Sequence, residues 1–141
     1  MKRRGLEREY LALVRGRPRS RSGRIEAAIG RDRRDPTRRS LDTDSPKDAV
    51  THFEVAQLYA AHALLRVHLE TGRTHQIRVH LASLGHPVAG DRVYGAPLMD
   101  RVPRRMFLHA WRIAFDSPAT GTKVQVEAPL PLELADWLAE L

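Results

Sequence analysis

Stretches in which apolar and polar residues alternate recur along the chain, and this pattern is typical of half-buried β-strands. Residues 10–14 (YLALV) instead form an unbroken apolar run, which predicts a buried strand with its first, third and fifth side chains on one face. Residues 51–57 and 63–71 predict a hairpin, and residues 105–115 and 123–127 predict a second one across a DSPATG turn. The pattern therefore predicts a chain in which strands dominate.

The apolar period changes to about 3.6 residues at 74–84, which predicts a helix of about three turns. Thr74 is the predicted N-cap, and the Gly-His-Pro sequence that follows the segment ends the helix. The predicted buried stripe of this helix consists of Ile77, Leu81 and Leu84. An amphipathic pattern at 129–141 predicts a C-terminal helix.

These elements predict an α+β fold: a mixed, mostly antiparallel sheet with the central helix at about 74–84 and the C-terminal helix packed on it. The 141 residues fit a single domain, since a chain of this length buries roughly two-thirds of the surface that it exposes when unfolded. Residues 17–45 are rich in Arg, Asp, Ser, Pro and Gly, and we predict a mobile basic loop region there. Within it, residues 25–29 predict a short edge strand or a turn.

The chain contains no cysteine, which excludes disulfides, thiolate metal sites and a cysteine nucleophile. No apolar run approaches the roughly 18 residues of a membrane span, and the N-terminus lacks the apolar core of a signal peptide, so we expect a cytoplasmic protein without membrane contact. His75 and His80 lie five residues apart, on different faces of the predicted helix, so the histidines predict no metal site.

Positive charge is concentrated at the start of the chain. Residues 1–40 carry a formal charge of +9, residues 41–141 carry −2, and the net charge is +7. Because 21 of the 24 basic residues are arginines, whose planar guanidinium suits phosphate, the charge predicts a polyanionic partner, most obviously a nucleic acid. A solvated arginine-rich segment is the alternative.

Arg78 lies near the positive end of the predicted helix, which is unfavourable for a cation unless an anion is close. Together with Arg73 it predicts an anion site for a phosphate or a carboxylate, although an exposed arginine pair would give the same pattern. His75 and Arg78 fall on one face of the helix, away from the apolar stripe. We find neither a Walker-type phosphate loop nor a G-x-S-x-G elbow in the sequence.

Residues 72–95, GRTHQIRVHLASLGHPVAGDRVYG, resemble the signature block of the RluA/RluD-type large-subunit ribosomal RNA pseudouridine synthases. The flanking segments agree with it along almost the whole chain: REYLALVRG, GRIEAAIGRD, AVTHFEV, LHAWRIAFDSPATG and EAPLP. The resemblance implies part of the pseudouridine synthase fold, isomerisation of uridine in RNA without metal or organic cofactor, and ribosomal RNA as the partner.

Members of the family place an aspartate, a tyrosine, an arginine and an aliphatic residue around the base. By motif position the resemblance implies Tyr10 for the ring that stacks on uracil, Arg78 for the arginine that pairs with the aspartate, and Leu108 for the apolar wall. We also predict RNA contacts from the following residues: Arg15, Arg31, Arg73, Thr74, His75 and Gln76. Asp91 matches a family position outside the catalytic block, and we predict no role for it.

The family's aspartate lies in a block resembling H-R-L-D-x-x-T-S-G, upstream of the strand that carries the tyrosine. These 141 residues contain no H-R-L-D stretch. We therefore predict the C-terminal part of a synthase catalytic domain that makes no pseudouridine by itself, whether through truncation, a misplaced start or a true half-gene. The alternatives are a non-catalytic RNA-binding module derived from the fold and a basic ribosome-associated protein. Uncovered strand edges or apolar faces would favour self-association.

Overall fold

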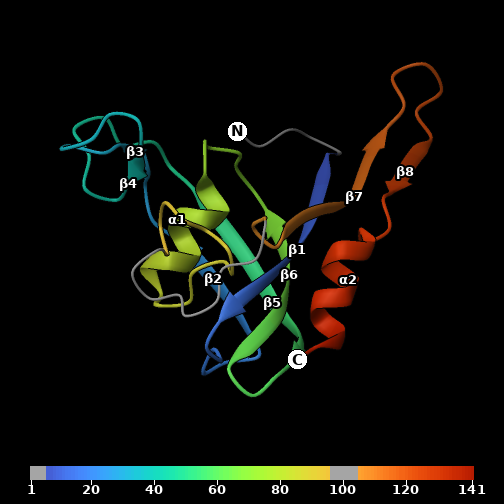
Figure 1. The fold of residues 1–141 in the computed structure, drawn as a ribbon. Coiled ribbons are helices and arrows are strands. Elements are labelled where there is room, and N and C mark those ends of the chain that lie inside the picture. Colours follow the sequence, from blue (N-terminus) through green and yellow to red (C-terminus); the bar gives the residue numbers. More distant parts are fainter. Residues whose placement is uncertain (1–5, 96–104) are drawn as a thin grey trace.

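A six-stranded sheet runs through the middle of the molecule (Figure 1). The computed structural model describes residues 6–95 and 105–141, and all elements named here lie in those ranges. In chain order they are β1 (Glu7–Arg15), β2 (Ser22–Glu26), β3 (Gly30–Arg31), β4 (Arg39–Ser40), β5 (Val50–Leu58), β6 (His62–Leu69), α1 (Gln76–Ser83), β7 (Leu108–Asp116), β8 (Lys123–Glu127) and α2 (Leu132–Ala139). The predicted α+β class is confirmed.

The strand order of the sheet is β2-β5-β6-β1-β7-β8, and β3 pairs with β4 in a separate small sheet. Both predicted hairpins are present, as β5–β6 and β7–β8. Every pairing between the described strands is antiparallel, so the mixed character that we expected of the sheet is not found there. The strand β1, which contains the predicted buried run 10–14, lies between β6 and β7. Backbone groups on both of its edges therefore have hydrogen-bond partners.

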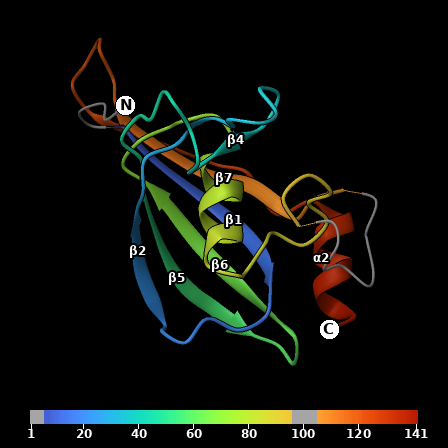
Figure 2. The same cartoon turned by 90° about the vertical axis from the view of Figure 1, so that its left-hand side faces the viewer.

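The two helices cover opposite faces of the sheet (Figure 2). The alternation along β1 explains this arrangement, because successive strand residues point to opposite sides. Ala12 and Val14 are fully buried in one core cluster with the α1 side chains Ile77 and Leu81, whereas Leu13 is buried in a second cluster with Leu134 of α2. With eight residues each, the two helices of the described ranges are too short to span a membrane.

Helix α1 is shorter than predicted, because it begins at Gln76 and ends at Ser83. Its N-cap is His75, not Thr74, and no side chain caps the first turn. His75 adopts a left-handed backbone conformation with φ 58°, which is uncommon for a residue with a side chain and bends the chain sharply into the helix. The prediction that Leu84 belongs to the buried stripe is also wrong, because this side chain is 46 % exposed.

The basic segment 17–45 contains more regular structure than we predicted. Residues 22–26 form β2, an edge strand of the main sheet, so the expected edge strand at 25–29 is present only at Ile25 and Glu26 and begins earlier. The β3–β4 hairpin was not anticipated from the sequence. The backbone amide of Arg39 donates a hydrogen bond of 2.9 Å to the Tyr94 hydroxyl, which fixes the hairpin to the loop after α1. The mobility of this segment stays a prediction.

One apolar pair lies uncovered on the sheet. Ile113 of β7 and Val126 of β8 are directly opposite each other and are 36 % and 53 % exposed. Such a pair on an open face agrees with the expectation of uncovered apolar surface. Self-association itself stays a prediction.

Candidate functional site

Arg78 lies on α1 and forms a bidentate ion pair with Asp91. Its Nε donates to one carboxylate oxygen at 2.8 Å and its Nη2 donates to the other at 3.0 Å. The Asp91 side chain is fully buried and that of Arg78 is 16 % exposed. The anion that the helix terminus was expected to need is therefore a carboxylate of this chain, which corrects the view that the 141 residues supply no partner for Arg78.

The loop after α1 holds Asp91 in place. Its Oδ1 also accepts hydrogen bonds from the backbone amides of Val93 and Tyr94, at 3.0 and 3.1 Å. Burial alone would raise the pKa of Asp91, but the hydrogen bonds from Arg78 and from the two amides outweigh it and lower the pKa below its ordinary value. Asp91 is thus held ionised, and its bonds to both helix and loop orient the guanidinium.

Tyr94 connects this ion pair to two other elements. Its ring lies 5.0 Å from the Arg78 guanidinium, within the range of a cation–π contact. Its hydroxyl accepts a hydrogen bond from the Arg39 amide and is hydrogen-bonded to Nδ1 of His75 at 2.8 Å. Burial lowers the pKa of His75, and the nearby cations Arg78 and Arg39 lower it further. His75 is therefore neutral near pH 7 and can accept this bond.

Tyr10 and Leu108 lie on the sheet face that α1 covers. Leu108 of β7 is opposite Ala12 of β1, and Tyr10 is opposite Ala110, so the two predicted site residues are diagonal neighbours on adjacent strands. Both are partly buried and pack against the core cluster that contains Ile77 and Leu81. The structure thus places all three predicted catalytic residues on one side of the sheet: two on its surface and Arg78 on the helix above it.

Gln76 was expected to contact RNA, yet it is only 2 % exposed and its amide is used within the fold. Its Nε2 donates to the Val50 carbonyl and to Thr51, and its Oε1 accepts from Thr71 and from the Arg73 amide. All four hydrogen-bonding positions are filled, so we do not carry Gln76 into the RNA interface.

The same buried network includes His80, which is fully buried. Its Nε2 donates to the Ala27 carbonyl at 2.8 Å, and its Nδ1 accepts from the Thr51 hydroxyl at 2.8 Å. This network joins α1 to β5 and to the chain just before β3, so His80 has a structural role. Within residues 6–95 and 105–141, no three His, Asp or Glu side chains gather in a way that would hold a metal ion.

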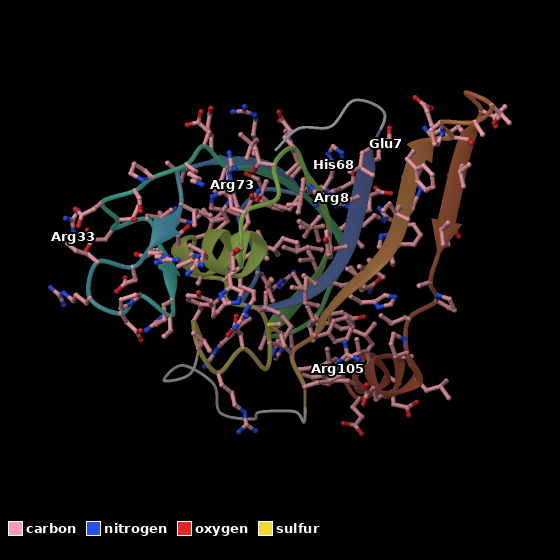
Figure 3. The ribbon with its side chains drawn as sticks, turned by 90° about the horizontal axis from the view of Figure 1, so that it is seen from above. Glu7, Arg8, Arg33, His68, Arg73 and Arg105 are labelled. Carbon is pink, nitrogen blue, oxygen red and sulfur yellow. The ribbon has the colours of Figure 1, made fainter. Side chains whose placement is uncertain are left out.

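His75 lies beside Tyr94, and the other four predicted RNA contacts separate into two places. Arg31, Arg73 and Thr74 line one hollow between the β3–β4 hairpin and the loop that enters α1. In the view from above, Arg73 lies between that hairpin, which carries Arg33, and the strands that carry Arg8 and His68 (Figure 3). Arg15 is not part of this group, because it is opposite His62 at the far end of β6, whereas Arg73 follows the other end.

Two residues near Arg78 were missed as functional candidates, Asp91 and Tyr94. The available signal was the GDRVYG loop, since a charged residue that follows a helix with an unexplained arginine is a natural partner for it. Arg39 and Lys47, which also line the hollow, were missed as well. No spacing rule indicates them, because they meet Arg73 only through the fold.

Comparison with known proteins gives a consistent result. The family model described as RNA pseudouridylate synthase matches residues 1–83. Ribosomal large subunit pseudouridine synthase D of Nitrosomonas europaea is 43% identical over 146 residues, covering 98% of this chain and 42% of that protein. An RNA pseudouridine synthase of Mycobacterium bovis, named as uncharacterized, is 45% identical over 136 residues, 94% of this chain and 44% of its own length. The chain thus spans less than half of these relatives.

Among solved structures, the human RNA pseudouridylate synthase domain containing 1 protein superimposes with a TM-score of 0.80 at 35% identity. The match covers 91% of this chain and 56% of that structure. Residues 1–5, at the start of the chain, lie outside the described residues, and the expected truncation rests on the missing H-R-L-D stretch alone.

Proposed function

Since the chain belongs to the RluA/RluD-type family of RNA pseudouridine synthases, we propose that it supplies part of the active site of an enzyme that isomerises uridine in ribosomal RNA. In this reaction the bond between the ribose and N1 of uracil breaks, the base turns, and a bond to C5 forms. The C5 hydrogen is released as a proton and N1 gains one, so the reaction balances without an external reagent. The observation that carries the proposal is the fixed guanidinium of Arg78.

Arg78 keeps donors available for a second carboxylate. Its Nε and Nη2 atoms donate hydrogen bonds to Asp91, while no described residue accepts a hydrogen bond from Nη1. We propose that this free edge pairs with the aspartate of an H-R-L-D segment, which the 141 residues do not contain. A guanidinium within about 4–6 Å would keep that aspartate ionised and reactive even when a flipped base excludes water from it. Asp91 then serves to hold Arg78 in the required orientation.

Tyr10 and Leu108 are proposed to hold the base and to exclude water. An aromatic ring offers a stacking surface for uracil, and an aliphatic side chain beside it keeps water from a sugar intermediate. The Tyr10 ring is partly buried and packs against the core cluster, which holds it on this face of the sheet. The target uridine must leave its stack to reach this face, at a cost of a few kcal/mol that contacts with the RNA backbone would offset.

The test compares this chain with a chimera. In the chimera, the part of the Nitrosomonas europaea synthase that precedes its matched region is joined to the N-terminus of the chain. Both are incubated with unmodified ribosomal RNA, and pseudouridine is scored by mass spectrometry. We expect no product from the chain alone and turnover by the chimera.

The chimera with Arg78→Ala is the matched control, and it should lose at least about a hundredfold in rate because the aspartate loses its electrostatic partner. Turnover by the chain alone would contradict the need for a second carboxylate. A folded chimera that binds RNA but makes no pseudouridine would instead favour the RNA-binding module.

A further inference from the structure

The hollow beside the β3–β4 hairpin has a lining that is strongly positive. Its volume is about 490 Å³, and its charged lining residues are all cations: Arg31, Arg39, Lys47 and Arg73. The rest of the lining consists of Ile29, Gly30, Ser45, Gly72 and Thr74. A hollow with four cations and no carboxylate in its lining favours an anion.

Six other arginines in the described part of the chain are paired with carboxylates, unlike these four cations. Arg24, Arg33, Arg66, Arg78, Arg105 and Arg112 each form an ion pair with an aspartate or a glutamate. In contrast, no carboxylate within residues 6–95 and 105–141 pairs with any of the four. The Nε of Arg73 donates to the Asp48 carbonyl at 2.8 Å, which holds its side chain at the hollow without neutralising it.

Backbone pairing forces two of the cations together. Arg31 of β3 and Arg39 of β4 are directly opposite each other in the hairpin, and like charges in such a position are destabilising. Lys47 is placed beside them, because its backbone exchanges two hydrogen bonds of 2.9 Å with Ile29. The hairpin therefore concentrates positive charge that the free protein does not neutralise.

Glycine allows the close approach that builds the hollow. A Cβ on Gly30 would lie 2.4 Å from the Ser45 carbonyl oxygen and from the Thr43 hydroxyl, so only glycine lets residues 43–45 cross β3 this closely. A Cβ on Gly72 would lie 2.7 Å from the Arg8 guanidinium. Only Gly30 is required for this close approach, because the Arg8 side chain is flexible and would move aside for a side chain at position 72.

We propose that this hollow binds a backbone phosphate of the RNA, at a point separate from the Arg78 site. The identification of the polymer as RNA rests on the proposed function, whereas the preference for phosphate rests on the hollow itself. Arginine forks match the oxygens of a phosphate, and the exposed Thr74 hydroxyl can add a hydrogen bond. A phosphate here would relieve the Arg31–Arg39 repulsion and position the RNA without reading its sequence.

The experiment measures RNA binding by the 141-residue chain and needs no catalysis. Binding of a short fluorescein-labelled single-stranded RNA is followed by anisotropy over a range of salt concentrations. The test variant is Arg31→Ala combined with Lys47→Ala, since both side chains are exposed and form no described contact that the fold needs. The matched control is Arg34→Ala, which removes an exposed charge from the same hairpin outside the hollow.

We expect the double variant to lose about tenfold in affinity and about 0.7 to 1 from the slope of log K against log salt. Arg34→Ala should lose less than about twofold. A morpholino of the same sequence, which has an uncharged backbone, should bind no better to the unmodified chain than to the double variant. Inorganic phosphate should compete only weakly with the RNA, because the free ion binds at the hollow alone whereas the RNA also makes contacts elsewhere on the protein.

Three results would overturn the phosphate site: equal losses for the double variant and Arg34→Ala, unchanged binding by the double variant, or no measurable RNA binding by the unmodified chain. Strong competition by low concentrations of inorganic phosphate would assign the hollow to the free ion instead. A failure of the chimera to make pseudouridine would remove the proposed function, and the salt slope would still decide whether the hollow contacts phosphate.

Discussion

The surroundings of Arg78 and the hollow at the hairpin are both built from arginines, but they treat charge in opposite ways. Around Arg78, one guanidinium has a buried carboxylate on one side and the Tyr94 ring at 5.0 Å. At the hollow, two arginines are directly opposite each other with no carboxylate partner among the described residues. The first region is pre-organised in the free protein, while the second becomes neutral only when an anion binds.

Tyr94 contacts both regions. Its ring faces Arg78, and its hydroxyl accepts the amide of Arg39, whose side chain lines the hollow. A change at the hairpin can therefore reach the ion pair through one side chain. His75, with its left-handed backbone, lies next to Tyr94, and the hydrogen bond between the two side chains helps to hold this uncommon conformation.

The largest effect is expected from breaking the pre-organised pair with Asp91→Asn. The asparagine can still accept the two loop amides, but it leaves a mostly buried guanidinium without its counter-charge. We expect the free energy of unfolding to fall by about 3 kcal/mol, as for other broken buried pairs. Urea denaturation followed by circular dichroism measures it.

The control for this variant is Glu26→Gln, which breaks the exposed Arg24–Glu26 pair of 2.7 Å. We expect its cost to be far smaller than that of Asp91→Asn, because solvent screens exposed pairs. Since the pKa of Asp91 is lowered in the folded state, the wild-type pair stabilises fully above about pH 4 and loses its contribution as the pH falls through the lowered pKa. Equal losses in the two variants would contradict the contrast between buried and exposed pairs.

How far the sequence could be used depends on whether a feature is local. The strands and the helix could be predicted from the spacing of apolar residues. Tyr10 and Leu108 could be selected from their positions in the motifs, and these two residues lie on the sheet face below α1. The partner of Arg78 could not be derived by period, because Asp91 reaches it through a loop. Thr74 failed as N-cap because the N-cap is His75 in a left-handed turn, and the His75 side chain bonds to Tyr94, a residue distant in sequence.

The hollow shows the same limit more strongly. Its cations come from the hairpin, from the chain before β5 and from the loop before α1, and composition alone could say only that the first 40 residues are basic. Gln76 failed as an RNA contact for the opposite reason. A glutamine within a functional motif suggests a contact with a ligand. Only the fold shows that its amide already donates hydrogen bonds to Val50 and Thr51.

A second prediction concerns the buried network under α1, which must stay uncharged. Burial lowers the pKa of His80 below its ordinary value of about 6.5. As the pH falls through 6.5, the unfolded chain takes up a proton that the folded protein refuses, so the free energy of unfolding should fall with pH until the lowered pKa is reached. One such group contributes a slope of at most about 1.4 kcal/mol per pH unit.

The measurement is urea denaturation at several pH values between about 5 and 8, on the wild-type chain and on His80→Gln. The variant should be less stable near pH 8, because it loses the bonds to Thr51 and Ala27, and it should show a shallower slope toward acid. Parallel slopes in the two proteins would mean that His80 does not carry the acid sensitivity. A shallower slope would show that the network, unlike the hollow, excludes charge.

The smallest predicted effect is also the one that tests whether the two regions are coupled. Tyr94→Phe keeps the ring over Arg78 and removes only the hydroxyl, which accepts a hydrogen bond from the Arg39 amide and is hydrogen-bonded to His75. We expect a loss of about 1 kcal/mol in the free energy of unfolding, the usual value for such hydrogen bonds. Tyr59→Phe is the matched control, since this partly buried ring packs on the other core cluster.

RNA binding by the same variant separates two explanations of the hollow. Tyr94→Phe removes no cation, so the salt slope should stay that of the wild type while the affinity falls by about twofold to threefold, because β4 is less firmly held. Arg31→Ala combined with Lys47→Ala should lower both quantities. If Tyr94→Phe lowers the slope as well, the phosphate contacts depend on the hairpin's exact position. If it changes neither quantity, the hollow and the Arg78 pair are independent, and the contrast between them holds without a connection through Tyr94.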